Sequence, residues 1–254
     1  MTKNNQQTNL WLYLGCGHHR MKGFTHVEVN VGKNKSGLPD ILADITDRIP
    51  LPDGSAELIF SRATLEHLTY PELINCLLES HRLLRRGGTI RMMVPDLDKY
   101  VDDYLHKIYD PTLKELYGMP NENFIDTFVA RIMYFDHRYN HTFDTMRRAL
   151  EKTGFDNVRL AQSGDSKVLP ANKILFESEQ KRDLEFIVEA EKLDSLPRVK
   201  HISKKYPAKL LPRLLAKWFN LKISPFFIRR PSFPQRYWFI ECFILFKQHL
   251  WQKK

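Results

Sequence analysis

Short apolar runs near the start of the chain are each followed by glycine or by an acidic residue. The first run is 11–14, and Gly15 and Gly17 come directly after it. The next run, 25–27, ends at Glu28. Runs of this length are typical of buried strands, and glycines after a strand permit a tight turn and a close approach of the backbone to a ligand. The order predicts a nucleotide-like ligand whose ribose hydroxyls bond to the Glu28 carboxylate.

The pattern continues with three further strands and one well-marked helix. Apolar runs at 41–43, 58–61 and 89–94 predict the strands, and Asp44 follows the first of them. A capping-box spacing at 69–72, with proline in the first turn, predicts a helix. Its expected buried face carries five apolar side chains, and Gly87-Gly88 is expected to end it. Those side chains are Leu73, Ile74, Leu77, Leu78 and Leu84.

Strands that alternate with helices of this length predict an α/β fold with a parallel, doubly wound sheet. Ligands of such sheets bind beyond the carboxyl ends of the strands. Two later runs, 157–162 and 184–189, are expected to pair as antiparallel strands, with 164–182 inserted between them as an edge loop. Such a loop is expected to border the ligand pocket.

An ordered set of motifs covers roughly residues 10–192 and resembles a known family, the type 11 branch of class I S-adenosylmethionine-dependent methyltransferases. The whole ordered set carries this resemblance, since each motif alone is weak. The motifs are Leu14-Gly15-Cys16-Gly17, Gly23-Phe24, Glu28, Asp44, Leu51-Pro52-Asp53-Gly54-Ser55, Leu65-Glu66-His67-Leu68, Leu83-Leu84-Arg85-Arg86-Gly87-Gly88 and Val94-Pro95-Asp96-Leu97. The likeness extends more loosely over 146–155 and 184–190.

The resemblance implies a Rossmann-like sheet of seven strands, the last antiparallel, with S-adenosylmethionine (SAM) as cofactor. The backbone of Gly15, Cys16 and Gly17 is then expected to pack against the methionine part. Glu28 takes the ribose hydroxyls, Asp44 with Ile45 lies at the adenine, and Ser61 lies near the donor sulfur.

Two positions depart from the pattern of that family. Many relatives carry an acidic residue where this chain has Tyr13, and His19 replaces a third glycine. The structural alternatives are that the glycines are ordinary turn residues, that Glu28 is a solvated loop carboxylate, and that Asp44 only caps a helix. They leave open a noncatalytic binding or scaffold protein with a degenerate copy of the fold.

Methyl transfer from a sulfonium mainly requires alignment of the reactants, whereas a hydroxyl acceptor also needs a base. Histidine is the side chain best suited to that role near neutral pH. The candidates are His18 and His19 after the glycine loop, His67, and the pair His137 and His141. We favour His141 over His67 as the catalytic base.

The four-residue spacing of His137 and His141 equals one helical turn, which is compatible with metal ligands on one face. No glutamate lies between them in the arrangement of zinc proteases, so we expect no metal site and a pocket-lining segment instead. Ser61-Arg62-Ala63-Thr64 stands where enzymes that methylate nucleobase amines often carry Asn/Asp-Pro-Pro-Tyr. A nucleobase amine is therefore a poor first choice of acceptor.

Charge and aromatic content change sharply after the expected methyltransferase domain. We divide the chain into a polar segment 1–9, the domain 10–195 and a mostly helical extension 196–254. Residues 198–254 contain 14 Lys and Arg but one acid, Glu241, and three of the four tryptophans. Such a segment suits an anionic membrane surface, with packing on a second subunit or nucleic acid as alternatives. Its longest apolar run, 237–246, is far shorter than the ~20 residues of a membrane span.

Three widely spaced cysteines and a polar start without a signal peptide favour a reducing cytoplasm, with peripheral attachment at the inner membrane face. Relatives of this branch are often associated with surface-glycan assembly. The sequence therefore predicts methylation of a sugar, a glycolipid or a related small hydroxyl compound. An RNA or an unrelated metabolite is the alternative acceptor.

Overall fold

The structure is a computed structural model that describes residues 10–17, 19–29, 39–117, 121–133, 136–166, 168 and 184–203. These residues all lie in one compact unit, Met1–Lys204. The extension from residue 204 onward lies outside the described residues, as do His18 and most of the expected loop 164–182. The domain boundaries and the proposed role of the extension therefore stay predictions.

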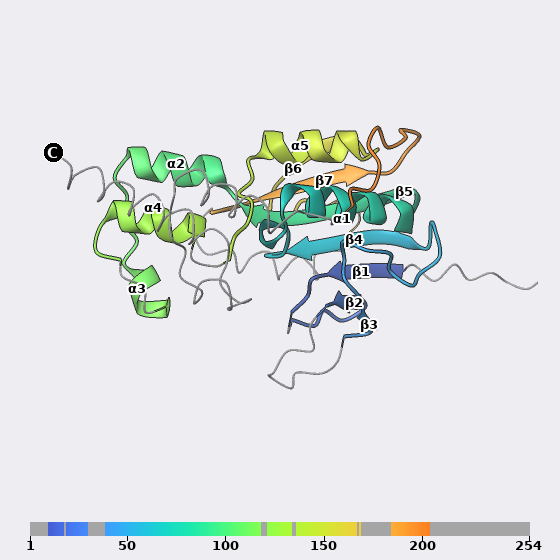
Figure 1. The fold of residues 1–254 in the computed structure, drawn as a ribbon, viewed down its shortest axis with the longest axis horizontal. Coiled ribbons are helices and arrows are strands. Elements are labelled where there is room, and N and C mark those ends of the chain that lie inside the picture. The colour runs from blue at the N-terminus through green and yellow to red at the C-terminus, as the bar shows by residue number, and fades with distance from the viewer. Residues whose placement is uncertain are drawn as a thin grey trace, which may run out of the picture. The chain divides into compact units, whose positions relative to one another are not determined.

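A sheet of seven strands forms the centre of the unit (Figure 1), in the order β3-β2-β1-β4-β5-β7-β6. The first five strands pair in parallel, and β7 is antiparallel to both of its neighbours. This confirms the Rossmann-like fold class with its antiparallel last strand. The strands are β1 (Leu10–Leu14), β2 (Thr25–Glu28), β3 (Ile41–Leu42), β4 (Ala56–Arg62), β5 (Leu84–Pro95), β6 (Asp156–Ala161) and β7 (Glu185–Glu191).

The strand order reverses between β1 and β4, which lie side by side although β2 and β3 separate them in the chain. Loops that leave two such strands diverge to opposite sides, and the space between them is where α/β sheets bind ligands. The residues after β1, β2, β3 and β4 therefore meet at the edge where all of the predicted cofactor residues lie.

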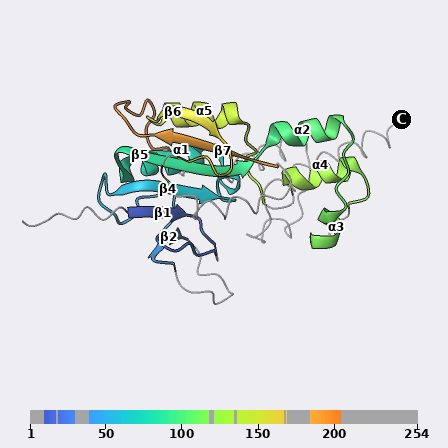
Figure 2. The same cartoon turned by 180° about the vertical axis from the view of Figure 1, so that it is seen from behind.

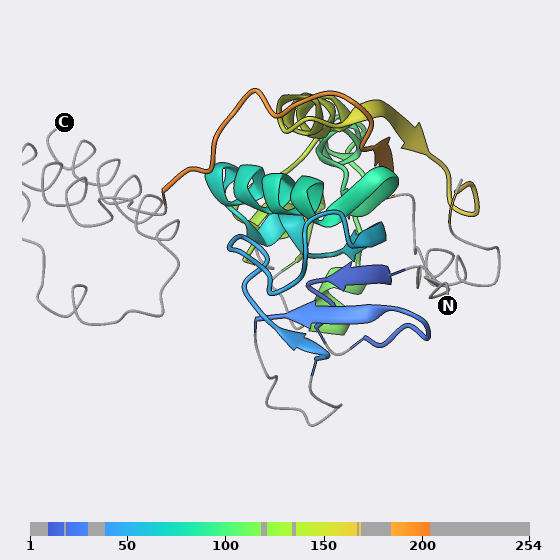
Figure 3. The same cartoon turned by 90° about the vertical axis from the view of Figure 1, so that its right-hand side faces the viewer.

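Two helices, α1 (Tyr70–Leu83) and α5 (Phe143–Lys152), pack against each other and bury their apolar sides in the larger core cluster (Figure 3). The capping box of α1 is present, since the Glu72 carboxylate accepts the Thr69 N–H at 2.8 Å. The described residues that pack on the other face of the sheet come from strands and loops, among them Phe24 and Phe60.

Helix α1 ends earlier than the sequence predicts. Its last residue is Leu83, and β5 begins at Leu84, so that Gly87-Gly88 lies inside a strand and not at a helix end. A Cβ at Gly88 would meet the Arg85 carbonyl oxygen at 2.9 Å and the Glu57 carbonyl oxygen at 3.1 Å. Glycine is required there because two backbone segments approach closely, which is a different reason from the termination of a helix.

Three further helices form an insert between β5 and α5: α2 (Leu97–Leu105), α3 (Thr112–Tyr117) and α4 (Phe124–Met133). They lie beyond the ends to which β1 and β4 point, as Figures 1 and 2 show from opposite sides. A short 3-10 helix, η1 (Leu65–His67), follows β4. The insert therefore stands over the edge at which ligands of this fold class bind.

A buried ion pair joins the antiparallel part of the sheet. Arg91 on β5 lies opposite Glu189 on β7, with 2.5 Å between Nη1 and Oε2, and both side chains are almost fully buried. Arg91 also donates to the carbonyl oxygens of Gln162 and Asp165, and Arg159 on β6 lies 3.3 Å from Glu189. Every charge buried here has a partner, as a buried charge requires.

Among the helices that the structure describes, none combines the length and the apolar composition that crossing a membrane requires.

Candidate active site

The glycine loop is held against the segment that follows β4. Gly15 has φ +65°, and its N–H donates to the Val27 carbonyl oxygen at 2.9 Å. The Thr64 hydroxyl lies 3.0 Å from the carbonyl oxygen of Gly15 and 2.9 Å from that of Arg62. A Cβ at Gly15 would lie 2.1 Å from Thr64 Cγ2, so only glycine fits this contact. The loop after β1 and the loop after β4 are thereby fixed to each other.

Glu28 lies at the end of β2, directly beside the glycine loop. Its Oε2 accepts the Gly17 N–H and its Oε1 accepts the Val29 N–H, both at 2.8 Å. These bonds orient the carboxylate, and each oxygen has a second lone pair that can accept from a ligand hydroxyl. The arrangement suits the ribose role that the family resemblance implies.

Asp44 and Ile45 follow the short strand β3. Asp44 Oδ1 accepts both the N–H and the hydroxyl of Thr46, which closes a turn, and no helix begins there. The alternative of a helix cap is therefore wrong. Ile45 is buried in the larger core cluster. The backbone and the Asp44 carboxylate at this corner are suited to meet an adenine.

Cys16 and Tyr13 bury their side chains in the core cluster on the second face of the sheet, and Cys16 Sγ lies 3.7 Å from the Gly17 carbonyl oxygen. Both belong to the cluster around Phe24 and Phe60, and Arg20 Nη1 lies 3.0 Å from Cys16 Sγ. Burial raises the pKa of both groups. Tyr13 is thus a packing residue where many relatives carry an acid, and Cys16 has only its backbone to offer a cofactor.

Ser61 is the buried polar group closest in register to the glycine loop. It lies opposite Leu14 of β1 and Met92 of β5, and 1% of its surface is exposed. Its Oγ has no hydrogen-bond partner among the described residues. A buried hydroxyl without a partner costs free energy, so this atom is suited to a ligand at the sheet edge.

Glu66 and His67 come next in the chain, on η1, and the segment 137–139 crosses them. The N–H groups of Arg138 and Tyr139 donate to the Glu66 carbonyl oxygen at 2.7 and 3.2 Å. The rings of His67 and His137 meet edge to face with centroids 5.4 Å apart. Ligand atoms of Glu66, His67 and His137 all lie within 4.8 Å of one another. Two segments far apart in the sequence therefore form one cluster.

The segment 136–141 is not helical, so the expected placement of His137 and His141 on one helix face is wrong. Asp136 has φ +57°, which breaks helical geometry just before His137. His141 instead pairs with the end of β5, where the Leu97 N–H donates to its carbonyl oxygen at 2.9 Å. Its ring is fully buried, and neither ring nitrogen has a partner with hydrogen-bond geometry among the described residues.

Burial sets the protonation of this cluster. It lowers the pKa of His141 to about 4, against a smaller opposing effect of the Leu65 backbone, and also lowers the pKa of His67. It raises the pKa of Glu66 to about 7. Both histidines are therefore neutral near pH 7, the form that accepts a proton or binds a metal. Candidate bases and ligands with perturbed pKa values in one place are typical of active sites.

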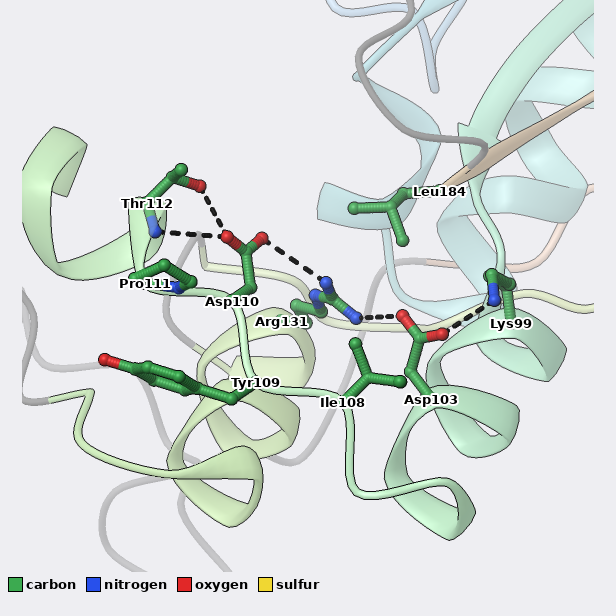
Figure 4. A pocket seen from close by; sticks show the side chains of 9 residues that line it. All are labelled: Lys99, Asp103, Ile108, Tyr109, Asp110, Pro111, Thr112, Arg131 and Leu184. Carbon is green, nitrogen blue, oxygen red and sulfur yellow. Dashed lines mark hydrogen bonds and ion pairs between the residues drawn. The ribbon is translucent and has the colours of Figure 1, made fainter.

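A cavity of about 510 Å³ lies in the helical insert, where Leu184 before β7 also lines it (Figure 4). Arg131 lies at its centre, with Nη1 2.7 Å from Asp103 Oδ2 and Nη2 3.4 Å from Asp110 Oδ2. Lys99 Nζ lies 2.7 Å from the other oxygen of Asp103. Nothing in the sequence pattern singles these residues out, because each belongs to a different element and only the fold brings them together.

Comparison with known proteins gives a match over part of the chain. Residues 23–92, from just before β2 into β5, match the family model described as a methyltransferase domain. A search among curated proteins found no match.

Solved structures with related folds include a SAM-dependent methyltransferase from Thermotoga maritima, described as a possible histamine N-methyltransferase. It is 14% identical, with 72% of this chain and 82% of that chain covered and a TM-score of 0.46. A SAM-dependent methyltransferase from Methanosarcina mazei is 18% identical over 74% and 94% of the two chains, with a TM-score of 0.45. One from Archaeoglobus fulgidus is 15% identical over 72% and 86%, with a TM-score of 0.43.

The matched segment, residues 23–92, is thus similar to a methyltransferase domain, and it contains Glu28, Asp44, Ile45 and Ser61.

We predict that Gly15→Ala destabilises the protein far more than Gly17→Ala. Both glycines have positive φ, so alanine costs about 1 kcal/mol at either position. A Cβ at Gly17 meets no atom within 4 Å, whereas at Gly15 it overlaps Thr64, which adds about 2 kcal/mol. Urea denaturation of the two variants without cofactor measures the difference. Equal losses of stability would show that the contact between Gly15 and Thr64 is not tight.

Proposed function

We propose that this enzyme transfers the methyl group of SAM to a hydroxyl of a sugar, a glycolipid or a related small compound. One observation carries the proposal: the Ser61 hydroxyl and the His141 ring, both buried and both without a hydrogen-bond partner in the described part of the chain, lie at the carboxyl ends of neighbouring strands. The Ser61 hydroxyl is suited to the methyl donor, and the His141 ring is suited to the acceptor. Both belong to the edge at which this fold class binds its cofactor.

On the donor side, different residues bind different parts of the cofactor. The backbone of Gly15, Cys16 and Gly17 takes the methionine part, and Glu28 takes the two ribose hydroxyls. The corner at Asp44 and Ile45 takes the adenine, and Ser61 lies by the sulfonium. The support is positional: these residues follow β1, β2 and β3 or end β4, and Glu28 already contacts the glycine loop.

On the acceptor side, His141 accepts the proton of the hydroxyl while the oxygen attacks the methyl carbon. The new bond joins that oxygen to the methyl carbon, the bond from the methyl carbon to sulfur breaks, and its electron pair returns to sulfur as S-adenosylhomocysteine leaves. The neutral state of the buried ring supports this role, although burial makes it a weaker base. His67 is the second candidate for the base.

The cavity in the helical insert supports a small polar acceptor. Its volume is in the range of small-molecule sites, and carboxylates, a guanidinium and the Tyr109 ring line it. Tyr100 of α2 lies next to the cavity, because the Arg131 guanidinium packs 5.4 Å from the Tyr100 ring centre. Paired hydroxyls of a sugar match such a polar lining.

The basic, aromatic extension supports work at the inner face of a membrane, with the enzyme in the cytoplasm. Each Lys or Arg near an anionic bilayer contributes about 1 kcal/mol of attraction. Residues 198–254 contain 14 basic residues and one acid, which is more positive charge than such an attachment needs. A lipid-linked acceptor would then be presented where the enzyme is held, and pairing of two copies through the extension is the competing role.

We predict that the purified protein binds SAM and S-adenosylhomocysteine, and that Glu28→Ala weakens both by about 10- to 100-fold, since hydrogen bonds to a charged group are lost. Isothermal titration calorimetry measures the affinities. Glu151→Ala, which removes a carboxylate from the exposed side of α5, is the matched control and should bind as the wild type does. Absence of binding by the wild type would refute the function.

We predict that His141→Gln lowers turnover on the true acceptor by about 10²- to 10⁴-fold while the affinity for SAM is unchanged. The acceptor is first found with radiolabelled SAM and fractionated lipids, glycans and RNA. Label is expected in a hydroxyl-bearing glycan or lipid fraction. Label in RNA alone would argue against a sugar or lipid hydroxyl as the acceptor. Full turnover by the His141 variant would argue against His141 as the base.

We predict that replacing Lys209, Arg213 and Lys217 by glutamine in the full chain weakens binding to vesicles of phosphatidylglycerol and phosphatidylcholine by roughly 100-fold. Cosedimentation measures this. A variant with Arg147, Arg148 and Lys152 of α5 replaced by glutamine removes the same charge elsewhere and should bind normally. An equal loss in both variants, or none in either, excludes the extension as the anchor.

A further inference from the structure

Three side chains form a set that methyl transfer with His141 as the base does not require. They are the Glu66 carboxylate and the imidazoles of His67 and His137, with ligand atoms within 4.8 Å of one another. Two imidazoles and one carboxylate are the ligands of many catalytic zinc sites, in which remaining positions stay open for a substrate. We propose that Glu66, His67 and His137 bind a divalent transition-metal ion, of which zinc fits the ligand set best.

The burial of Glu66 is an independent observation that points to a ligand. Only 2% of its surface is exposed, and its Oε2 has no hydrogen-bond partner among the described residues. A buried carboxylate oxygen without a partner is costly, and an ion removes that cost. Within the described residues, no Lys or Arg forms an ion pair with Glu66, so a metal cation is the natural counter-charge.

The backbone holds the three ligands in place before any ion binds. Glu66 and His67 are adjacent on η1, and the two N–H groups after His137 donate to the Glu66 carbonyl oxygen. Ala63 and Asp136, which precede the two ligand segments, both have positive φ, at 49° and 57°. Non-glycine residues in that conformation are strained and cluster at functional sites. A strained turn thus leads into each half of the set.

The separation of the ligand atoms is compatible with one ion after a small movement. Ligand atoms about 2.1 Å from zinc lie roughly 3.4 Å from one another in a tetrahedral site. Closing from at most 4.8 Å therefore needs movements of about 1.4 Å or less, which rotation of the side chains supplies. His67 is only half-buried, so an ion can reach the three side chains past this residue.

Such an ion has a chemical use that rests on the proposed function. An acceptor hydroxyl bound to zinc loses its proton more readily, as zinc-bound water does. The proton passes to His141, the resulting alkoxide oxygen bonds to the methyl carbon of SAM, and the electron pair of the broken bond stays on sulfur. His67 then acts as a metal ligand, and His141 is left as the base.

The test is a titration of the full chain, freed of metal with a chelator, with Zn²⁺ alone. Calorimetry should show about one equivalent bound to the wild type. Glu66→Gln and His67→Gln should each weaken binding by more than about 100-fold, beyond the loss seen when only an outer partner of a metal ligand is removed. His106→Gln, at the exposed end of α2, is the control and should bind as the wild type does. Circular dichroism confirms that the variants fold.

Co²⁺ gives a second readout that does not depend on activity. Its visible absorption should show nitrogen and oxygen ligands in the wild type and change in His67→Gln. A wild type that binds SAM and transfers methyl groups but takes up no Zn²⁺ overturns the metal site alone. A wild type that binds one Zn²⁺ but no SAM upholds the metal site and overturns the proposed function. Equal Zn²⁺ binding by the wild type and both ligand variants also overturns the site.

Discussion

The contact between Gly15 and Thr64 is the constraint on which the rest of the active site depends. The Thr64 hydroxyl lies 3.0 Å from the Gly15 carbonyl oxygen, and its methyl group occupies the space of the missing Cβ. This contact joins the loop after β1 to the loop after β4 at the point where the strand order reverses. Because Thr64 directly precedes η1, the position of the glycine loop also fixes the positions of Glu66 and His67.

In the proposed function, the active site is divided between two parts of the fold. The donor half is the edge of the parallel sheet at which the strands bring Gly17, Glu28 and Ser61 together. The acceptor half is the helical insert together with His141, which pairs with the end of β5. The choice of acceptor would then depend on the insert.

The sequence predicted the strands and the capping box of α1 because these depend on local patterns of apolar residues and caps, whereas the sheet of seven strands with an antiparallel last strand was implied by the family resemblance. Gly87-Gly88 misled because a glycine pair that ends a helix and one that permits close backbone approach look the same in sequence. The approach of Glu66 to His137 and the ion pairs of Arg131 with Asp103 and Asp110 could not be foreseen, since they depend on how distant segments cross. The helical spacing of His137 and His141 was misleading for the same reason.

A crystal structure of the complex with S-adenosylhomocysteine would test where the cofactor binds. We expect both ribose hydroxyls within hydrogen-bond distance of the Glu28 oxygens, the adenine at Asp44 and Ile45, and the sulfur facing Ser61 and the side of the site that contains His141. A cofactor bound elsewhere, or bound at this edge with its ribose turned away from Glu28, would contradict this expectation.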